Sequence, residues 1–323
     1  MFKYQFDFNN NQITYKAASS AAEDKLYKVP NNSIKVLPAD INRLFDECHN
    51  IIFEVTEKCN LECEYCAYGY NYIQPKTRPL HRGKEMSWQT AKTLLDYYIE
   101  KWNQKGDNSL PIAINYYGGE PLTNFKLISK ITDFILDNKP EEQQIIFHIT
   151  TNAILLRRHI HWLKDNDFHI SVSIDGNKTS NIYRKDKNGV ESFNNVISTL
   201  DYISDTYPEY FQSRIMFQSV LNSNSNIDHI KSFFQDRYGK TTEFMPISKN
   251  HLSKHNDIDI IAGKWLKPKE NSAIIDQATI IKRFTSFFYD DYLDFINSKP
   301  IVASGTCIHF SNRVFISALL VMR

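Results

Sequence analysis

The stretch EKCNLECEYCAYG, residues 57–69, places Cys59, Cys63 and Cys66 in a CxxxCxxC spacing, in a chain with five cysteines among 323 residues. An odd number of cysteines, three of them clustered, is unlike the even disulfide framework of a small secreted protein. In a reducing compartment such a cluster is typical of metal binding or redox chemistry. We therefore ask which site uses three thiolates and not a fourth.

Composition narrows the class of protein. The chain is 42% hydrophobic and 13% aromatic, which allows one large α/β domain or two ordinary ones. Its formal net charge of +1 gives no bias toward nucleic acid or an anionic membrane, so neither is an expected partner. No stretch approaches the ~18 to 20 apolar residues of a membrane span. The first residues, MFKYQFDFNNNQ, lack the apolar core of a signal peptide, and we predict a cytoplasmic protein.

A repeating pattern from residue 51 onward predicts the fold class. Each unit has a short apolar run, a loop and an amphipathic helix; in the first helix, Ser87 is the predicted N-cap. That helix presents Trp88, Ala91, Leu95, Tyr98 and Trp102 at helical spacing. The predicted strands are 51–55, 112–117, 145–150, 169–174, 214–221 and 243–248, and later helices are expected near 125–136, 157–166, 193–203, 227–234 and 280–296. Six such units predict an α/β fold with a parallel sheet, either doubly wound or barrel-like.

Polar motifs follow the first four predicted strands. Cys59 follows the first strand, GGEP the second, TTNA the third and DG the fourth. Ligands of parallel α/β folds gather at the carboxyl ends of the strands. We therefore expect these motifs to form one site.

The cysteine triplet is compatible with two kinds of metal site. Structural zinc takes four protein ligands, and Cys48, His49 and His81 are the nearby candidates for a fourth. Cys48 lies at the other end of the first predicted strand, far from the triplet, and Cys307 is remote in sequence. A 4Fe–4S cube on three cysteines keeps one iron open for a small molecule. Three metal-free cysteines in one loop would be an oxidation hazard.

The stretch CNLECEYCAYG resembles the cluster loop of the radical S-adenosylmethionine enzymes. The resemblance implies a partial (β/α)6 TIM-like barrel, with metal ligands Cys59, Cys63 and Cys66 holding a 4Fe–4S cluster. It implies S-adenosylmethionine bound to the open iron through its amino and carboxylate groups. In this family the reduced cluster cleaves the sulfonium bond, and a 5′-deoxyadenosyl radical abstracts hydrogen from the substrate. An electron donor such as flavodoxin or ferredoxin is then an expected partner.

Two further motifs carry the resemblance. YYGGEPL resembles the GGE motif, so Gly118, Gly119 and Glu120 are expected to hold the methionyl amino group of the cofactor. The alternative is an ordinary glycine turn. Tyr68, two residues past Cys66, is expected against the adenine; the alternative is an aromatic side chain used for packing.

TTNAILL resembles the family's TNG turn and carries Asn152, another expected cofactor contact. Ala153 stands where glycine is usual. An unusual backbone angle is costly for alanine, so we expect a modest local adjustment of the turn.

SVSIDGNKTSNIYRKDKNGVESF resembles the SxDG…R stretch of peptide- and protein-modifying members, among them anaerobic sulfatase maturases. By this resemblance Ser173 and Arg184 bind the cofactor's carboxylate, and an arginine fork suits that group. The chain departs from the pattern after the DG, where it has Asn177 instead of proline, and at Ser180–Asn181, where a His-Asp pair is usual. The alternative is a surface arginine in a charged segment.

We predict an N-terminal appendage over residues 1–49 with small strands and a short helix around 41–47, a barrel core over 50–250, and a C-terminal segment over 251–323. TCIHFSNRVFIS, residues 306–317, resembles the opening of the SPASM extension that carries auxiliary iron–sulfur clusters. Cys307 alone cannot hold such a cluster, and the apolar ending ALLVM favours a shortened chain.

The predicted function is a radical S-adenosylmethionine oxidoreductase that abstracts hydrogen from a peptide or protein, with no general base assigned. RNA and a small metabolite are the alternative substrates. A zinc-stabilised binding module without catalysis is the alternative of another class. A remnant that binds the cluster and S-adenosylmethionine without turnover is the third.

Overall fold

The structure of the protein is a computed structural model, which describes residues 2–7, 12–17, 26–28, 48–69, 83–104, 110–247, 258–263, 303–310 and 317–322. The chain forms two compact units, Met1–Leu44 and Phe45–Arg323. The first contains an antiparallel sheet of β1 (Phe2–Asp7), β2 (Gln12–Ala17) and β3 (Leu26–Lys28), in that order. The predicted small strands are therefore present. The short helix expected around 41–47 lies outside the described residues.

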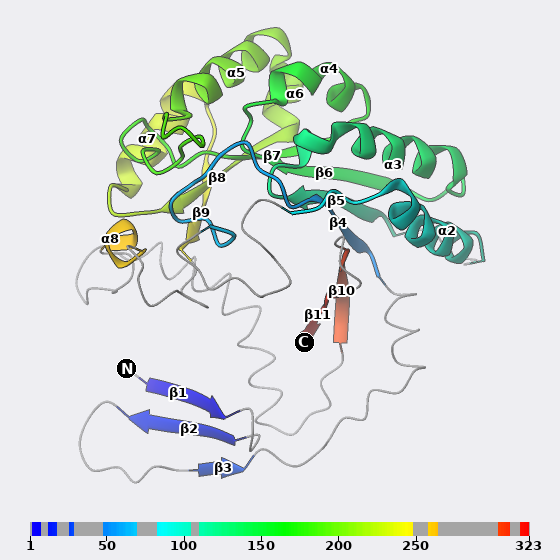
Figure 1. Ribbon diagram of the computed structural model, residues 1–323, viewed down its shortest axis with the longest axis horizontal. Coiled ribbons are helices and arrows are strands. Elements are labelled where there is room, and N and C mark those ends of the chain that lie inside the picture. The colour runs from blue at the N-terminus through cyan, green and yellow to red at the C-terminus, as the bar shows by residue number, and fades with distance from the viewer. Residues whose placement is uncertain are drawn as a thin grey trace. The chain divides into compact units, whose positions relative to one another are not determined.

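Within the described part of the larger unit, six consecutive strands form a parallel sheet (Figure 1). They are β4 (Asn50–Thr56), β5 (Ile112–Gly118), β6 (Ile145–Thr151), β7 (His169–Ser173), β8 (Ile215–Leu221) and β9 (Thr242–Pro246). They are neighbours in chain order, with Phe53 opposite Tyr116 and Tyr116 opposite Ile149. A doubly wound sheet reverses its strand order at a switch point, and these six strands do not. The predicted α/β fold is confirmed, in its barrel-like form.

Helices lie along one face of this sheet (Figure 1). The helical elements are α2 (Trp88–Gln104), the 3₁₀ turn η1 (Pro121–Asn124), α3 (Phe125–Asn138), α4 (Leu156–Asp165), α5 (Phe193–Thr206), α6 (Pro208–Arg214), α7 (Ile227–Tyr238) and α8 (Ile258–Ala262). Ser87 Oγ accepts a hydrogen bond from the Thr90 N–H at 3.1 Å, which is the predicted N-cap of α2. Ala91, Leu95, Tyr98 and Trp102 are buried as predicted.

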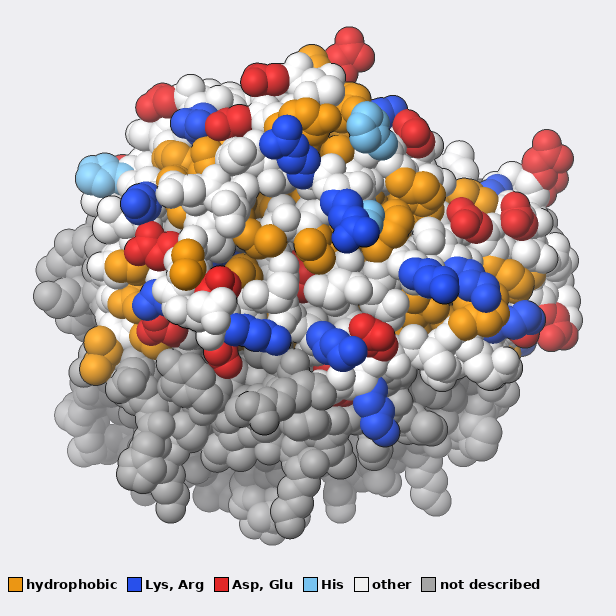
Figure 2. Space-filling model, turned by 45° about the horizontal axis from the view of Figure 1, so that its top comes forward, with side chains coloured by type: hydrophobic (Ala, Val, Ile, Leu, Met, Phe, Trp, Pro, Cys, Tyr) orange, Lys and Arg blue, Asp and Glu red, His pale blue; other side chains and the backbone are white. Residues whose placement is uncertain are grey.

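The strands alternate between an apolar and a polar face. On β5, Ile112, Ile114 and Tyr116 are buried in the core, whereas Asn115 and Tyr117 are more accessible. The face of the sheet opposite the packed helices is therefore polar along this strand. On the outside of the molecule, Figure 2 shows positive and negative side chains interspersed over the visible face, in keeping with the small net charge.

Two strands that the pattern of βα units did not include extend the sheet beyond β4. β10 (Ala303–Phe310) pairs in parallel with β4, and β11 (Ser317–Met322) pairs with β10 in antiparallel orientation. Cys307 lies in β10, opposite Asn50 and Leu319 in register. The helix expected over 280–296 lies outside the described residues. None of the helices in the described parts combines the length and apolar character of a membrane span.

Candidate functional site

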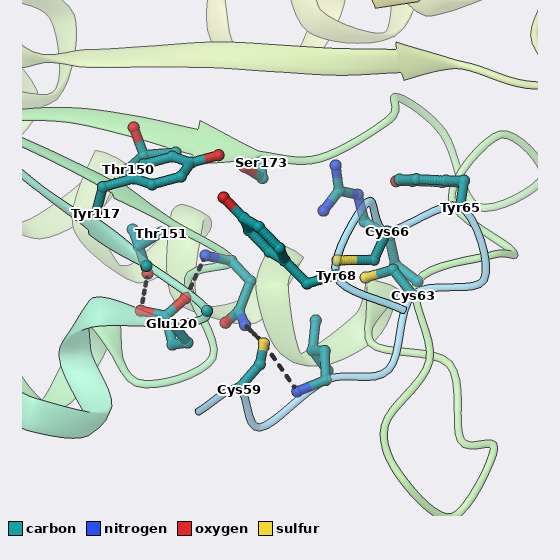
Figure 3. A pocket seen from close by; sticks show the side chains of 15 residues that line it. Cys59, Cys63, Tyr65, Cys66, Tyr68, Tyr117, Glu120, Thr150, Thr151 and Ser173 are labelled. Carbon is teal, nitrogen blue, oxygen red and sulfur yellow. Dashed lines mark hydrogen bonds between the residues drawn. The ribbon is translucent and has the colours of Figure 1, made fainter. Parts of the chain in front are cut away.

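The three clustered cysteines lie on a loop that directly follows β4, and we call residues 57–69 the cluster loop. Two tight turns shape it, because the Cys66 N–H donates to Cys63 O at 3.0 Å and the Gly69 N–H donates to Cys66 O at 2.7 Å. Cys59, Cys63 and Cys66 all line one pocket (Figure 3). Cys48 does not line it. This cysteine is buried two residues before β4, and its Sγ donates to Asn50 O at 3.3 Å.

The remaining wall of this pocket comes from the carboxyl ends of β5, β6 and β7 and from Arg184 in the segment after β7 (Figure 3). All of the sequence-predicted cofactor contacts line it: Tyr68, Gly118, Gly119, Glu120, Asn152, Ser173 and Arg184. Sequence reasoning missed Leu61, Tyr65, Tyr117, Thr150 and Thr151, which line it as well. Tyr117 and Thr150 could have been found from strand alternation, since each lies at a strand end on the polar face.

The three thiols of this loop are half-buried. Burial raises the pKa of Cys59 to about 12, although the Leu61 N–H donates to its sulfur at 3.4 Å. Burial also raises the pKa of Cys63, against the opposing effect of the Arg184 charge. In the metal-free chain these two groups are therefore thiols at neutral pH, and a metal that binds them displaces protons.

The donors around Cys59 suit an iron–sulfur cluster. The side-chain amide of Asn152 lies 3.8 Å from the Cys59 sulfur, and Asn60 Nδ2 is buried without a hydrogen-bond acceptor in the described structure. Hydrogen bonds to sulfur are among the means by which proteins tune such clusters. Among the described residues, no three or more His, Cys, Asp or Glu side chains are grouped to hold a single metal ion, so the cysteines are not arranged as a mononuclear site.

Gly118 and Gly119 bring the end of β5 against the backbone that leads into the cluster loop. Gly118 has φ +141°, and a Cβ there would lie 2.1 Å from Thr56 O. A Cβ on Gly119 would lie 2.2 Å from Lys58 O. The Gly119 N–H donates to Thr56 O at 2.9 Å. The glycines are therefore required for packing against the loop, whatever ligand they also meet.

Glu120 is buried and bonded within the chain. Its carboxylate accepts hydrogen bonds from the Leu122 N–H at 3.1 Å, the Thr151 hydroxyl at 2.8 Å and the Asn152 N–H at 2.7 Å. Burial raises its pKa to about 7, against those three donors. Since a carboxylate accepts about four hydrogen bonds, one position is left for the expected ammonium group.

The turn after β6 keeps an unusual backbone angle at its alanine. Ala153 has φ +64°, in the left-handed region, so the expected adjustment away from that angle does not occur. The Ala153 N–H donates to Thr151 Oγ1 at 3.0 Å, and its carbonyl accepts from the Leu156 N–H at 3.2 Å. These bonds hold the turn in this conformation, which costs the alanine about 1 to 2 kcal/mol.

Arg184 is a buried residue and not a surface arginine, which excludes that alternative. Only 6% of it is exposed, and its Nε and Nη2 donate to Asp175 Oδ1 at 3.0 and 2.9 Å. Asp175 belongs to the DG turn that the sequence placed after the fourth strand. Two nitrogens of the guanidinium that we expected to face a cofactor carboxylate are thus bonded to Asp175 within the protein.

Comparison with known proteins identifies the class. The model of the Radical SAM superfamily matches residues 53–234. An uncharacterised protein of Methanocaldococcus jannaschii is 33% identical over 223 residues, covering 67% of this chain and 70% of the relative. The cysteine-type anaerobic sulfatase-maturating enzyme of Clostridium novyi is 24% identical over 247 residues, covering 76% of this chain and 60% of the relative. The radical SAM cyclopropyl synthase of Paramaledivibacter caminithermalis is 25% identical over 257 residues, covering 76% of this chain and 50% of the relative.

Solved structures show the same fold. A histidine-tagged anSMEcpe with bound AdoMet has a TM-score of 0.58 at 18% identity, covering 82% of this chain and 70% of that one. Native anSMEcpe with bound AdoMet and the Cp18Cys peptide has a TM-score of 0.53 at 20% identity, covering 76% and 60%.

The chain belongs to the radical SAM superfamily. The predicted cofactors, S-adenosylmethionine and a 4Fe–4S cluster, are those of this family. Its named relatives include sulfatase-maturating enzymes and a cyclopropyl synthase, so the homologues are enzymes.

Proposed function

We propose that this chain is a radical S-adenosylmethionine enzyme that abstracts hydrogen from a peptide or protein. One observation carries the proposal: three cysteines of a single loop and the carboxyl ends of β5, β6 and β7 line the same pocket. No other cysteine and no histidine of the described residues lines it, so three thiolates are the ligand set offered to a cluster.

The cysteines and the predicted cofactor contacts have defined places in the proposal. Cys59, Cys63 and Cys66 hold the 4Fe–4S cluster, which when bound supplies the electron that cleaves the sulfonium bond of S-adenosylmethionine. Glu120 and the Gly118–Gly119 backbone receive the amino group of that cofactor, while Ser173 and Arg184 receive its carboxylate. The full list of proposed cofactor contacts is Tyr68, Gly118, Gly119, Glu120, Asn152, Ser173 and Arg184.

A peptide or protein is the proposed substrate class. The named relatives include two sulfatase-maturating enzymes, and an anSMEcpe structure contains a peptide. The near-neutral charge of the chain and the mixed surface in Figure 2 favour a peptide over RNA. The proposal includes a flavodoxin- or ferredoxin-type electron donor, a cytoplasmic location and a SPASM-type relationship to the maturases.

Anaerobic reconstitution tests the function directly. The wild-type chain is expected to bind about four iron and four sulfide per chain, the content of one cube. With dithionite and S-adenosylmethionine it is expected to release 5′-deoxyadenosine. The matched control is Cys48→Ser, which changes a buried cysteine outside the pocket and should keep the iron; Cys63→Ser should lose it.

The zinc-stabilised binding module is the alternative. Stoichiometric zinc without labile sulfide would establish it and refute the cluster. Iron uptake and cofactor binding without 5′-deoxyadenosine would instead support the non-catalytic remnant.

A further inference from the structure

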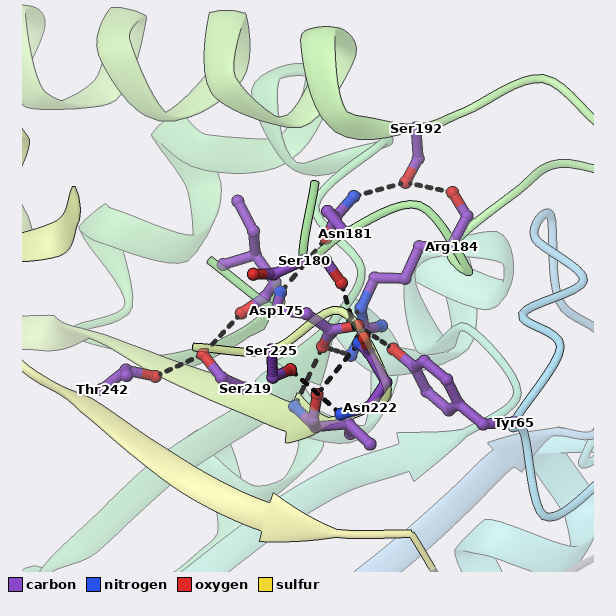
Figure 4. A network of polar contacts seen from close by, with 12 residues as sticks. Tyr65, Asp175, Ser180, Asn181, Arg184, Ser192, Ser219, Asn222, Ser225 and Thr242 are labelled. Carbon is purple, nitrogen blue, oxygen red and sulfur yellow. Dashed lines mark hydrogen bonds and ion pairs between the residues drawn. The ribbon is translucent and has the colours of Figure 1, made fainter. Parts of the chain in front are cut away.

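Asp175, two residues past the end of β7, is the centre of a buried polar network (Figure 4). Its carboxylate is 0% exposed and accepts from four donors. They are Arg184 Nε at 3.0 Å, Arg184 Nη2 at 2.9 Å, the Val220 N–H at 2.9 Å and the Tyr65 hydroxyl. Three of these donors bond Oδ1 and the Tyr65 hydroxyl bonds Oδ2, so both oxygens of the carboxylate are held by the protein itself.

Tyr65 brings the cluster loop into this network. It lies between Cys63 and Cys66, and its ring centroid is 5.4 Å from the Arg184 guanidinium carbon. It is 8% exposed and lines the same pocket as the cysteines. The Asp175 carboxylate therefore contacts both the loop that carries the proposed metal ligands and the arginine proposed to bind the cofactor.

The backbone holds the same two segments together. The Glu62 N–H donates to Lys185 O at 2.7 Å, and the Glu64 N–H donates to Tyr183 O at 3.1 Å. These bonds flank Cys63 on one segment and Arg184 on the other. The two side chains are thus held opposite each other by residues more than a hundred positions apart in the sequence.

The orientation of Arg184 follows from these contacts. Its Nε and Nη2 are directed at Asp175, and its Nη1 donates to no acceptor among the described residues. Arg184 also lines the pocket beside Cys63 and Ser173. Without Asp175, a guanidinium on a long side chain would be free to turn, and its buried charge would be uncompensated.

We propose that Asp175 is a positioning residue that presents the Nη1 edge of Arg184 to the carboxylate of S-adenosylmethionine, and that Tyr65 ties the cluster loop to the same carboxylate. This inference rests on the proposed function, in which Arg184 receives that carboxylate. Asp175 acts through Arg184 and touches neither cofactor in this assignment.

The test compares two ligands on the reconstituted full chain. S-adenosylmethionine carries the carboxylate, and its decarboxylated analogue lacks it, so the ratio of their Kd values reports on every group that binds the carboxylate. The change in this ratio between the wild type and a variant that leaves the cluster and Ser173 in place reports on Arg184. The wild-type protein should favour S-adenosylmethionine. Asp175→Asn places an amide N–H₂ against donors and should reduce that preference about tenfold or more, the effect of losing a charge-assisted hydrogen bond.

Asp167→Asn is the matched control. Asp167 also pairs with an arginine in two hydrogen bonds, to Arg214 Nε at 2.7 Å and Nη2 at 2.9 Å, but it precedes β7 and does not line the pocket. Its φ of +51° is a conformation that asparagine tolerates. This variant should keep the wild-type preference within about twofold, because it removes the same charge away from Arg184.

Tyr65→Phe is a second test, which remains informative if the Asp175→Asn protein does not fold. It removes one hydroxyl and should reduce the preference about two- to fivefold with the iron content unchanged. A preference in Asp175→Asn and Tyr65→Phe equal to that of Asp167→Asn overturns this inference alone. Wild-type protein that takes up iron but shows no preference between the two ligands overturns the proposed role of Arg184 and this inference with it.

Discussion

Two glycines at the end of β5 determine how closely the cluster loop can approach the sheet. Gly118 lies in a conformation with φ +141° and against Thr56 O, while Gly119 lies against Lys58 O. Both contacts are with backbone atoms, which cannot rotate away as a side chain can. The cluster loop and the end of β5 can therefore pack this closely because residues 118 and 119 have no Cβ atom.

At this scale we predict that Gly118→Ala destabilises the cluster-free chain by about 3 kcal/mol or more, since steric overlap adds to backbone strain. The control is Gly189→Ala, at φ +80° with nothing within 4 Å of the added Cβ. It should cost only the strain, about 1 kcal/mol. Urea unfolding at equal m-values measures both. Equal losses of unfolding free energy in the two variants would show that the close approach of Gly118 to Thr56 does not contribute to stability.

Among the secondary-structure elements, β6 and β7 place two histidines side by side. His148 lies opposite His169 in register, with ring centroids 4.8 Å apart. Burial lowers the pKa of His148, and the neighbouring His169 lowers it further. Burial and then Arg214 lower the pKa of His169, against Asp167, which raises it. Both rings are therefore held neutral on the folded strands.

This pairing predicts an acid-sensitive contribution to stability. The unfolded chain protonates histidine near pH 6.5, and the folded chain does so only at lower pH. Below about pH 6.5 the unfolded state thus binds more protons, and the free energy of unfolding falls as the pH falls. His148→Gln should lose less stability than the wild type between pH 6.5 and 5. Between pH 7 and 8 the difference between the two proteins should stay constant. Curves of unfolding free energy against pH that run parallel for the two proteins from pH 5 to 8 would contradict this prediction.

In the molecule as a whole, the cluster loop joins elements that are distant in the chain. It bonds to the β5 end through Glu120 N–H and Lys58 O at 2.8 Å, to the turn after β6 through Asn152 and Asn60 at 2.7 Å, and to Asp175 through Tyr65. A group bound by this loop is thus coupled to most of the parallel sheet.

We therefore predict that removing the cluster from reconstituted protein with a chelator lowers Tm by about 5 °C or more, because a ligand bound to the folded state stabilises it. The Cys59→Ser, Cys63→Ser, Cys66→Ser triple variant is the control, and the chelator should leave its Tm unchanged. The same Tm for loaded and stripped wild-type protein would indicate that the loop folds independently of the metal. Because the pKa of Cys59 is about 12 in the metal-free chain, cluster uptake should release protons and strengthen as pH rises.

The sequence by itself determined the parallel α/β sheet, the helices against it and the residues at its strand ends. These features follow from local periodicity and from motifs such as CNLECEYC and GGEP, whose spacing places them after successive strands. It also predicted Cys59, Cys63 and Cys66 as the ligand set that we propose. A local pattern suffices there because neighbours in the chain are neighbours in the fold.

Only the tertiary structure decided the contacts between distant segments. The pairing of residues 62–64 with 183–185, the Tyr65–Asp175–Arg184 network and the place of β10 beside β4 have no local signature. The burial of Arg184 likewise depends on a carboxylate and a loop brought there by other strands. Periodicity reports which face of one element is apolar, and it does not report which side chain of another element meets that face.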